Sequence, residues 1–269
     1  MMECQKALKA TDNDLSAAMD WLRKHGASKA SQKVQGRETH EGLVGLALRK
    51  DAAVLVRVAA ETDFASRSET FVELVDGVAH AILEDSSMST GSLDDVSSAV
   101  RTDGTTVKTM LDEAIVAIRE NLSVADAFKM QSDDLSLVGY IHNRLGPSAG
   151  TAAAVVALSV DDASKENVQE IGKKLAMHVV AARPTYMVPE DIPADIVQKE
   201  KEILLADLAS TGKPPEILEK IVAGRLRKYY ESVCLLEQAH MIEPDSPVVK
   251  KFLKSQGMQV HDFKVFSIN

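Results

Sequence analysis

The sequence is poor in aromatic residues and long apolar runs, and it has no excess of positive charge. Aromatic residues make up only 4% of the 269 residues, so the cores must be built mainly from Ala, Val, Leu and Ile. The net charge of −9 argues against a protein that binds nucleic acid through its phosphates. The longest apolar run, residues 151–160, is shorter than the roughly 20 residues of a membrane-spanning helix. We therefore expect no direct nucleic-acid contact and no membrane insertion.

Cysteine is equally scarce. Cys4 and Cys234 are far apart and lack metal-ligand spacing, which indicates free thiols in a reducing compartment, although one disulfide is also compatible with the count. The seven histidines are scattered, and the chain has no HExxH pair, GxSxG elbow or GxxxxGK[ST] loop. The residues thus predict no catalytic centre, metal site or cofactor.

The N-terminal residues predict two short helices. The sequence T-D-N-D at 11–14 supplies N-cap oxygens, and a stop follows at His25-Gly26. One face of the second helix would carry Leu15, Ala18, Met19 and Leu22. Two such helices bury too little surface to fold alone, so we expect a module that lacks its first helix. The polar segment 28–40 indicates a linker.

The central part alternates strand and helix patterns. Residues 41–64 predict a β-hairpin with a turn at Lys50-Asp51. A helix over 66–84, a Ser-rich loop over 85–98 and a helix over 106–122 follow. The order then repeats, with two strands in 135–160, a helix over 166–182 and a closing strand over 260–268. This pattern predicts two related α+β halves around antiparallel sheets.

Within the second half, between its helix and the closing strand, lies a segment of different character. Prolines at 184, 189 and 193 predict an extended stretch, followed by helices over 194–210 and 214–236. Gly212 would end the first helix, and Pro214 or Pro215 would begin the second. Apolar stripes suit an antiparallel pair and consist of Ile196, Ile203 and Leu204 on one helix and Ile217, Ile221, Leu226 and Tyr229 on the other.

Phe64 stands where the first hairpin ends, in E-T-D-F-A-S-R-S at 61–68. A core phenylalanine would usually lie within the strand, whereas one beside a helix-capping signal can point outward. From the pattern alone, two alternatives are equally open: Phe64 packs in its own core with Asp63 as a helix N-cap, or it contacts another molecule.

Several motifs resemble those of the elongation factor Ts family. In order they are MMECQKAL at 1–8, ETDFASRS at 61–68, IREN at 118–121, GYIHN at 139–143, AMHVVAARP at 176–184, KPPEILEKIVAGRLRKYYESVCLLEQ at 213–238 and MIEP at 241–244. T-D-F alone would be a weak signal, but the ordered series covers essentially the whole chain. The resemblance implies an α+β protein with a partial N-terminal ubiquitin-associated-like helical module, a two-subdomain core with antiparallel sheets and packed helices, and an inserted antiparallel helical hairpin.

The resemblance also sets the expected boundaries. The partial module covers 1–27, the linker 28–40, the core N-subdomain 41–130, the core C-subdomain 131–186 and 237–269, and the inserted hairpin 187–236. The family motif begins with a helix and an L-R-x-x-T-G turn, neither of which precedes Met1. The resemblance therefore implies that the chain begins inside the module.

The function implied is that of a guanine-nucleotide exchange factor, with no catalytic site of its own, that promotes GDP release from GDP-bound elongation factor Tu. In the family, the T-D-F loop wedges between two helices of the GTPase and disturbs the Mg²⁺ and phosphate site, a role that falls here to Thr62, Asp63 and Phe64. Further partner contacts implied by position are Met1, Met2, Cys4, Ile118, Glu120, Asn121, His142, Met241 and Ile242. The chain departs from the family at Gln5, Ala65, Arg119 and His240, where lysine, valine, glycine and an aromatic residue are usual.

Two other classes are weighed against this one: a non-exchange protein-binding adaptor with a ubiquitin-associated-like module, and a hydrolase using Asp63 and His142. The adaptor lacks its first helix here, and the hydrolase lacks a third catalytic group. Segments 20–30 and 224–238 resemble alphaproteobacterial and mitochondrial forms. We expect a protein of the mitochondrial matrix, with bacterial cytoplasm as the alternative, and self-association through the helical hairpin is a further expectation.

Overall fold

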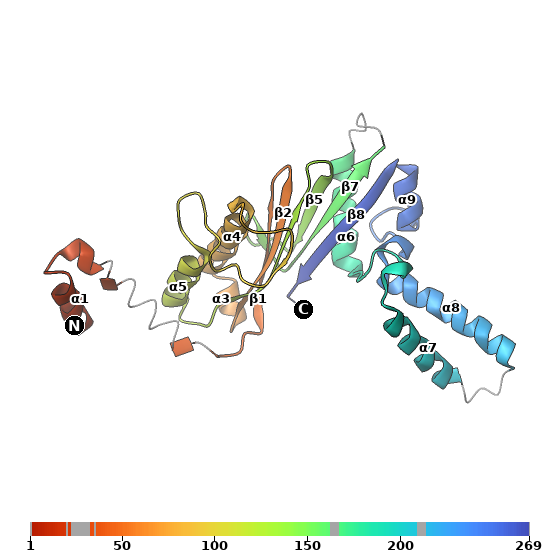
Figure 1. Ribbon diagram of the computed structural model, residues 1–269, viewed down its shortest axis with the longest axis horizontal. Coiled ribbons are helices and arrows are strands. Elements are labelled where there is room, and N and C mark those ends of the chain that lie inside the picture. The colour runs from red at the N-terminus through yellow and green to blue at the C-terminus, as the bar shows by residue number, and fades with distance from the viewer. Residues whose placement is uncertain are drawn as a thin grey trace. The chain divides into compact units, whose positions relative to one another are not determined.

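The computed structural model describes residues 2–19, 21–22, 33–34, 36–161, 167–208 and 214–268. The chain forms two compact units (Figure 1). The first contains Met1–Asp133, Ile141–Ala153 and Phe266–Asn269, and the second contains Asp134–Tyr140 and Ala154–Val265. Within the described ranges, no helix has the length and apolar character needed to cross a membrane.

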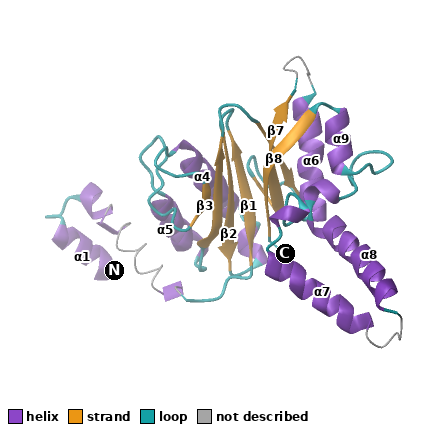
Figure 2. Ribbon diagram, turned by 45° about the vertical axis from the view of Figure 1, so that its right-hand side comes forward, coloured by secondary structure: helices purple, strands orange, loops and turns teal. Residues whose placement is uncertain are grey.

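The first unit is built on a five-stranded antiparallel sheet with the order β3-β4-β2-β1-β6. Figure 2 labels β1, β2 and β3 of this sheet. Its strands are β1 (Glu41–Leu48), β2 (Ala52–Ala60), β3 (Gly91–Leu93), β4 (Ser123–Gln131) and β6 (Ala149–Gly150). The predicted hairpin is confirmed, because β1 and β2 pair from Glu41↔Ala60 to Leu48↔Ala53. Every residue of β2 except Arg57 is buried, which explains its nearly continuous apolar sequence.

Three strands of this sheet were not expected from the sequence: β3, β4 and the two-residue β6, which falls in the turn predicted within 135–160. The prediction of an unbroken loop over 85–98 is wrong, because β3 lies within it and pairs with β4. β4 itself contains polar residues, and its pattern is set by its place between β2 and β3. Strand formation here follows from pairing with neighbours, a context that short local patterns do not contain.

Helix α4 (Glu69–Glu84) lies against β1 and β2. It begins where the Ser68 hydroxyl accepts a hydrogen bond from the Phe71 backbone N–H at 3.3 Å. The helix approaches β1 closely at Gly45, where an added Cβ would lie 3.0 Å from Val75 Cγ1. The helix predicted over 66–84 is therefore confirmed for most of its length, although a separate short helix, α3 (Asp63–Ser66), precedes it.

The end of α4 is held by a buried lysine from β4. Lys129 is 2% exposed, and its Nζ donates to the carbonyl oxygens of Ile82 at 3.0 Å and Asp85 at 2.8 Å. A cation at a helix C-terminus satisfies carbonyl groups that have no partner within the helix. Burial lowers the pKa of the Lys129 amine.

Helix α5 (Val107–Ile118) packs against α4 and is shorter than the helix predicted over 106–122. It ends because Arg119 adopts a left-handed conformation with φ of 65°, which stops the helical hydrogen-bonding pattern. An L-residue in this region costs about 1–2 kcal/mol, and glycine avoids most of that cost.

We therefore expect Arg119→Gly to raise the free energy of unfolding by about 1 kcal/mol, measured by urea denaturation. The matched control is Arg67→Gly, because Arg67 also follows a helix but has a φ of −93°. That control should lower stability slightly through added freedom in the unfolded chain. Equal destabilisation by both substitutions would contradict the strain at position 119.

The second unit contains most of a three-stranded sheet with the order β5-β7-β8. Its strands are β5 (Ser136–His142), β7 (Ala152–Val160) and β8 (Met258–Ser267), so the two strands predicted in 135–160 and the closing strand are confirmed. Helix α6 (Val168–Ala182) agrees with the helix predicted over 166–182. Helix α9 (Val249–Ser255) and the 3-10 turn η3 (Leu235–Glu237) were not predicted.

Helices α7 (Ala194–Leu208) and α8 (Pro215–Val233) lie side by side as a helical hairpin, as predicted (Figure 1). The preceding segment is not fully extended, because Pro189–Asp191 form the 3-10 turn η1. The expected stripes are wrong in part, since Ile196, Ile203 and Ile217 are 37%, 54% and 47% exposed. The predicted Leu204, Ile221 and Leu226 do lie in the contact between the helices. The other residues of that contact are Leu208, Leu218, Val222 and Tyr230. Gly212 lies outside the described residues.

The N-terminal residues contain α1 (Met2–Ala10) and a helical turn over 15–19. The N-cap predicted in 11–14 is confirmed, because Asp14 Oδ1 accepts from the Ala17 backbone N–H at 2.9 Å. Leu15 and Met19 are 73% and 66% exposed, so the predicted apolar face is not buried as a whole. The predicted stop at His25-Gly26 lies outside the described residues.

Candidate functional site

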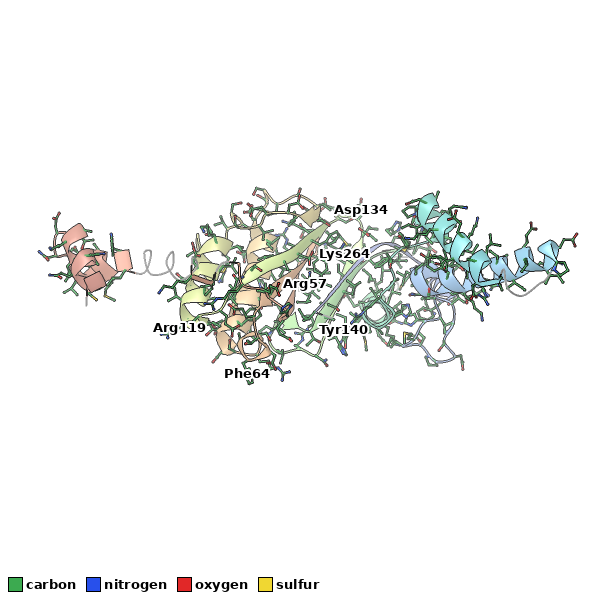
Figure 3. All side chains as sticks on the ribbon, turned by 90° about the horizontal axis from the view of Figure 1, so that it is seen from below. Arg57, Phe64, Arg119, Asp134, Tyr140 and Lys264 are labelled. Carbon is green, nitrogen blue, oxygen red and sulfur yellow. The ribbon has the colours of Figure 1, made fainter. Side chains whose placement is uncertain are left out.

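Phe64 is the most exposed large apolar side chain among the described residues, at 85%. It lies on α3 at the outer margin of the first unit (Figure 3). The next two residues, Ala65 and Ser66, are buried. The alternative in which Phe64 packs in its own core is therefore wrong, because the short helix turns its neighbours inward and leaves the ring in solvent.

The N-cap of α3 is Thr62. Its Oγ1 accepts from the Ala65 backbone N–H at 3.2 Å, so the expectation that Asp63 caps the helix is wrong. Asp63 instead begins the helix, and its carbonyl oxygen accepts from Ser66 Oγ at 3.0 Å. A capped single turn fixes the direction of the Phe64 Cα–Cβ bond.

A carboxylate from a distant segment holds this loop in place. Glu120 Oε2 accepts from the Thr62 backbone N–H at 3.0 Å, and Glu120 Oε1 accepts from Thr62 Oγ1 at 2.7 Å. In return, Glu61 Oε1 accepts from the Asn121 backbone N–H at 2.6 Å. Hydrogen bonds to a charged acceptor are stronger than those between neutral groups. Residues 61–62 and 120–121 thus form a reciprocal clamp beneath Phe64.

This clamp changes the interpretation of two predicted contact residues. Both Glu120 carboxylate oxygens bind Thr62, and Asn121 Nδ2 donates to the Arg37 carbonyl oxygen at 2.7 Å. Their polar groups therefore stabilise the loop from within. The contributions of Glu61 and Arg37 were missed, because nothing in their local sequence shows which distant segment they meet.

The remaining predicted residues of the first unit lie in varied settings. Ile118 is half-buried and packs against the core of this unit. His142 ends β5, and its carbonyl oxygen accepts from the Thr151 backbone N–H at 3.0 Å. Met2 begins α1, and Cys4 on that helix is an exposed free thiol. Met1 lies outside the described residues.

The other cysteine, Cys234 in the second unit, is also a free thiol, and burial raises the pKa of this thiol to about 11.

A second exposed apolar feature lies in the second unit, where Met241 and Ile242 are 60% and 36% exposed. The base of their loop is closed by two backbone bonds, from Val249 N–H to the Gln238 carbonyl oxygen at 2.9 Å and from His240 N–H to the Pro247 carbonyl oxygen at 2.8 Å. This loop is hereafter the 238–249 loop.

Two buried histidines pack together where the 238–249 loop meets α6: His240 belongs to the loop and His178 to the helix. The rings of His178 and His240 are 5.1 Å apart between centroids, and His240 meets the Phe252 ring edge-on at 5.2 Å. His240 Nδ1 accepts from the Ile242 backbone N–H at 3.3 Å. Burial, with a smaller effect of the neighbouring His178 ring, lowers the pKa of His240 to about 4. Glu243 opposes this shift and Lys174 adds to it.

This low pKa predicts acid sensitivity. The unfolded chain takes up a proton near pH 6.5, whereas folded His240 does so only near pH 4, so stability is lost as pH falls between these values. The contribution lost is about 3 kcal/mol at 1.36 kcal/mol per pH unit. We expect His240→Phe, which keeps the ring packing, to lose correspondingly less stability over this range. The control is His40→Phe at an exposed position, and urea denaturation at several pH values gives the measurement. Parallel pH curves for parent and His240→Phe would contradict the prediction.

Among the described side chains, no group of three or more His, Cys, Asp and Glu residues is arranged to hold a metal ion. The prominent features are instead two exposed apolar loops on rigid supports. Such features are typical of surfaces that bind another protein.

Comparison with known proteins agrees with a protein of this class. Residues 61–269 match the family described as Elongation factor TS. The chain is 37% identical over 264 residues to the elongation factor Ts of Sinorhizobium fredii, covering 97% of this chain and 84% of that protein. The same identity and coverage hold for elongation factor Ts of Rhizobium leguminosarum bv. trifolii, and the identity to that of Rhizobium etli is 36%. The chain therefore belongs to the elongation factor Ts family.

Family membership assigns the chain to translation elongation as a nucleotide exchange factor for elongation factor Tu, rather than as an enzyme in the usual sense. It favours this function over the adaptor and the hydrolase. The expectation of a mitochondrial protein finds no support, because the relatives named above are bacterial.

Proposed function

We propose that this chain promotes GDP release from the GDP-bound form of elongation factor Tu by inserting Phe64 into the GTPase domain. One observation carries the proposal: Phe64 is 85% exposed on a capped helical turn that Glu120 holds in place. A large apolar ring held rigidly in solvent loses little conformational freedom when it enters a pocket on a partner.

The proposed mechanism is a linkage between two binding events. Mg²⁺ requires near-ideal octahedral coordination, so a small displacement of its ligands weakens nucleotide binding. Phe64 need not touch the nucleotide. It only has to favour a conformation of the partner in which the magnesium and phosphate ligands are displaced. Nucleotide and exchange factor then weaken each other's binding equally, typically by about 1–3 kcal/mol.

Further contacts complete the proposed interface. Thr62 and Asp63 would shape the wedge, with Glu120 and Asn121 supporting it from within the chain. The exposed 238–249 loop would present a second apolar contact. Additional contacts are assigned to Met1, Met2, Cys4, Ile118, His142, Met241 and Ile242.

The domain assignment stays a proposal with the boundaries given above, in which 187–236 is an appendage outside the main interface. Self-association through the α7–α8 hairpin is proposed on the exposure of Ile196, Ile203 and Ile217. The proposed setting is the bacterial cytoplasm, with no direct contact to nucleic acid.

Release of a fluorescent GDP analogue from a bacterial elongation factor Tu tests the proposal. Increasing concentrations of the chain should accelerate release to a saturating rate. Addition of excess GTP should separate the two proteins, as reciprocal linkage requires. Binding without any acceleration of release would support the adaptor instead.

A further inference from the structure

A buried chain of hydrogen bonds leads from the α7–α8 hairpin to the 238–249 loop. It begins at the Ser232 carbonyl oxygen in the last turn of α8, which accepts from Gln238 Nε2 at 2.9 Å. Gln238 Oε1 lies 3.0 Å from His178 Nε2 on α6. His178 Nδ1 lies 3.2 Å from the backbone nitrogen of Met241. The chain therefore connects three elements of the second unit with an exposed methionine.

The chemistry of these groups fixes the direction of each bond. The Met241 backbone nitrogen can only donate, so His178 Nδ1 is the acceptor and Nε2 carries the ring proton. That proton is donated to Gln238 Oε1, which leaves the Gln238 amide nitrogen to donate to Ser232. One neutral tautomer and one amide orientation satisfy every bond. A second proton on His178 would place two N–H groups against each other at Met241.

Burial makes this arrangement specific. His178 is 0% exposed and Gln238 is 4% exposed, whereas Met241 is 60% exposed. Polar groups buried away from water strongly favour the one conformation in which all are paired. The Met241 backbone is thereby fixed from the inside while its side chain extends into solvent.

From this geometry we infer that His178 and Gln238 are positioning residues that hold Met241 and Ile242 in the conformation in which the pair contacts the partner protein. The inference rests on the proposed function, because it takes this pair as a contact with elongation factor Tu. It goes beyond that function because it makes the contact depend on His178 and Gln238, which are too deeply buried to touch the partner themselves. It also links the contact to the last turn of α8, because the Ser232 carbonyl oxygen of that helix accepts a hydrogen bond from Gln238.

A charge introduced at position 238 tests the proton arrangement. In Gln238→Glu, the carboxylate favours a second proton on His178 and turns Nδ1 from acceptor into donor. The titratable groups that face His178 include His240, whose ring centroid lies 5.1 Å from that of His178. Lys174, one turn earlier on α6, forms an ion pair with Glu243, with 3.0 Å between Nζ and Oε1. We expect the variant to bind GDP-bound elongation factor Tu about tenfold more weakly near pH 6 than near pH 8, with the parent changing much less. A variant with the parent's pH profile would overturn the inference.

A matched pair of substitutions tests the acceptor directly. Asparagine and leucine have similar shape, but only the asparagine amide oxygen can accept from the Met241 N–H. We expect His178→Leu to weaken binding about tenfold and His178→Asn to weaken it far less. In a Met241→Ala/Ile242→Ala background the two should bind alike, because both side chains that His178 positions are gone. A difference that persists in that background would overturn the inference.

Two controls separate failure of the inference from failure of the proposed function. If the Met241→Ala/Ile242→Ala variant binds normally while the parent chain still accelerates GDP release, the inference fails and the proposed function stands. If the parent chain does not accelerate release, the proposed function fails. Hydrogen exchange of the Met241 amide in the free parent chain requires neither a partner nor a variant. Strong protection supports the buried bond, and an unprotected amide overturns the inference.

Discussion

Phe64→Ala should reduce the saturated rate of GDP release from elongation factor Tu at least tenfold while leaving the fold almost unchanged. The ring is 85% exposed, so its removal forfeits little burial within the chain. Surface substitutions usually change stability by no more than about 0.5 kcal/mol. A tenfold slower rate corresponds to roughly 1.4 kcal/mol of lost differential binding. Thermal unfolding and stopped-flow release of a fluorescent GDP analogue give the two measurements.

Phe71→Ala is the matched control, because Phe71 is 0% exposed and lies only seven positions along the chain. Its loss should destabilise the protein by about 3–5 kcal/mol. Well below its unfolding temperature, the folded fraction of this variant should still reach a near-normal saturated release rate. The wedge proposal fails if Phe64→Ala exchanges as fast as the parent at saturation.

Release of the clamp beneath Phe64 should have the second-largest effect. Glu120→Ala removes the acceptor of both the Thr62 N–H and the Thr62 hydroxyl, bonds of 3.0 and 2.7 Å. Hydrogen bonds to charged groups contribute about 1.5–3 kcal/mol each, and their loss leaves the loop free to move. We expect the affinity for GDP-bound elongation factor Tu to fall about tenfold, because the loop must then be ordered on binding. Isothermal titration calorimetry gives the measurement.

Substitutions at Thr62 provide the control for this clamp. Thr62→Ser keeps the hydroxyl that bonds Glu120 and caps α3, whereas Thr62→Val keeps the shape and loses both bonds. The serine variant should resemble the parent, and the valine variant should resemble Glu120→Ala. The losses in the double variant should be less than additive, because both substitutions remove the bond between the Thr62 hydroxyl and Glu120. Fully additive losses would mean that Glu120 contacts the partner directly, as its sequence position first implied.

Much of the fold is determined by local sequence. The hairpin of β1 and β2, helices α4 and α6, and the α7–α8 hairpin all have apolar patterns or capping residues of their own. Each was predicted because its periodicity and its ends lie within a few consecutive residues. The ordered motifs likewise pointed to the family that the comparisons show.

Other features could be identified only in the folded structure, because they depend on residues that are far apart in the sequence. β3 and β4 depend on the neighbours that pair with them, and the burial of Lys129 depends on the end of α4 lying above it. The sequence placed Phe64 beside a capping signal but left its direction open. The Phe64 ring points into solvent because Thr62 and Glu120 hold the turn of α3 in place and Ala65 occupies its buried side.

The sequence by itself thus determined most of the longer helices, the β1–β2 and α7–α8 hairpins, the family, and the candidate status of Phe64 and Met241. Only the tertiary structure decided what holds those two side chains in solvent. Glu120 is 58 residues from Thr62, and His178 is 63 residues from Met241. Hydrogen bonds between residues so far apart in the sequence form only when distant elements pack together. A local sequence pattern does not indicate which distant groups will become neighbours.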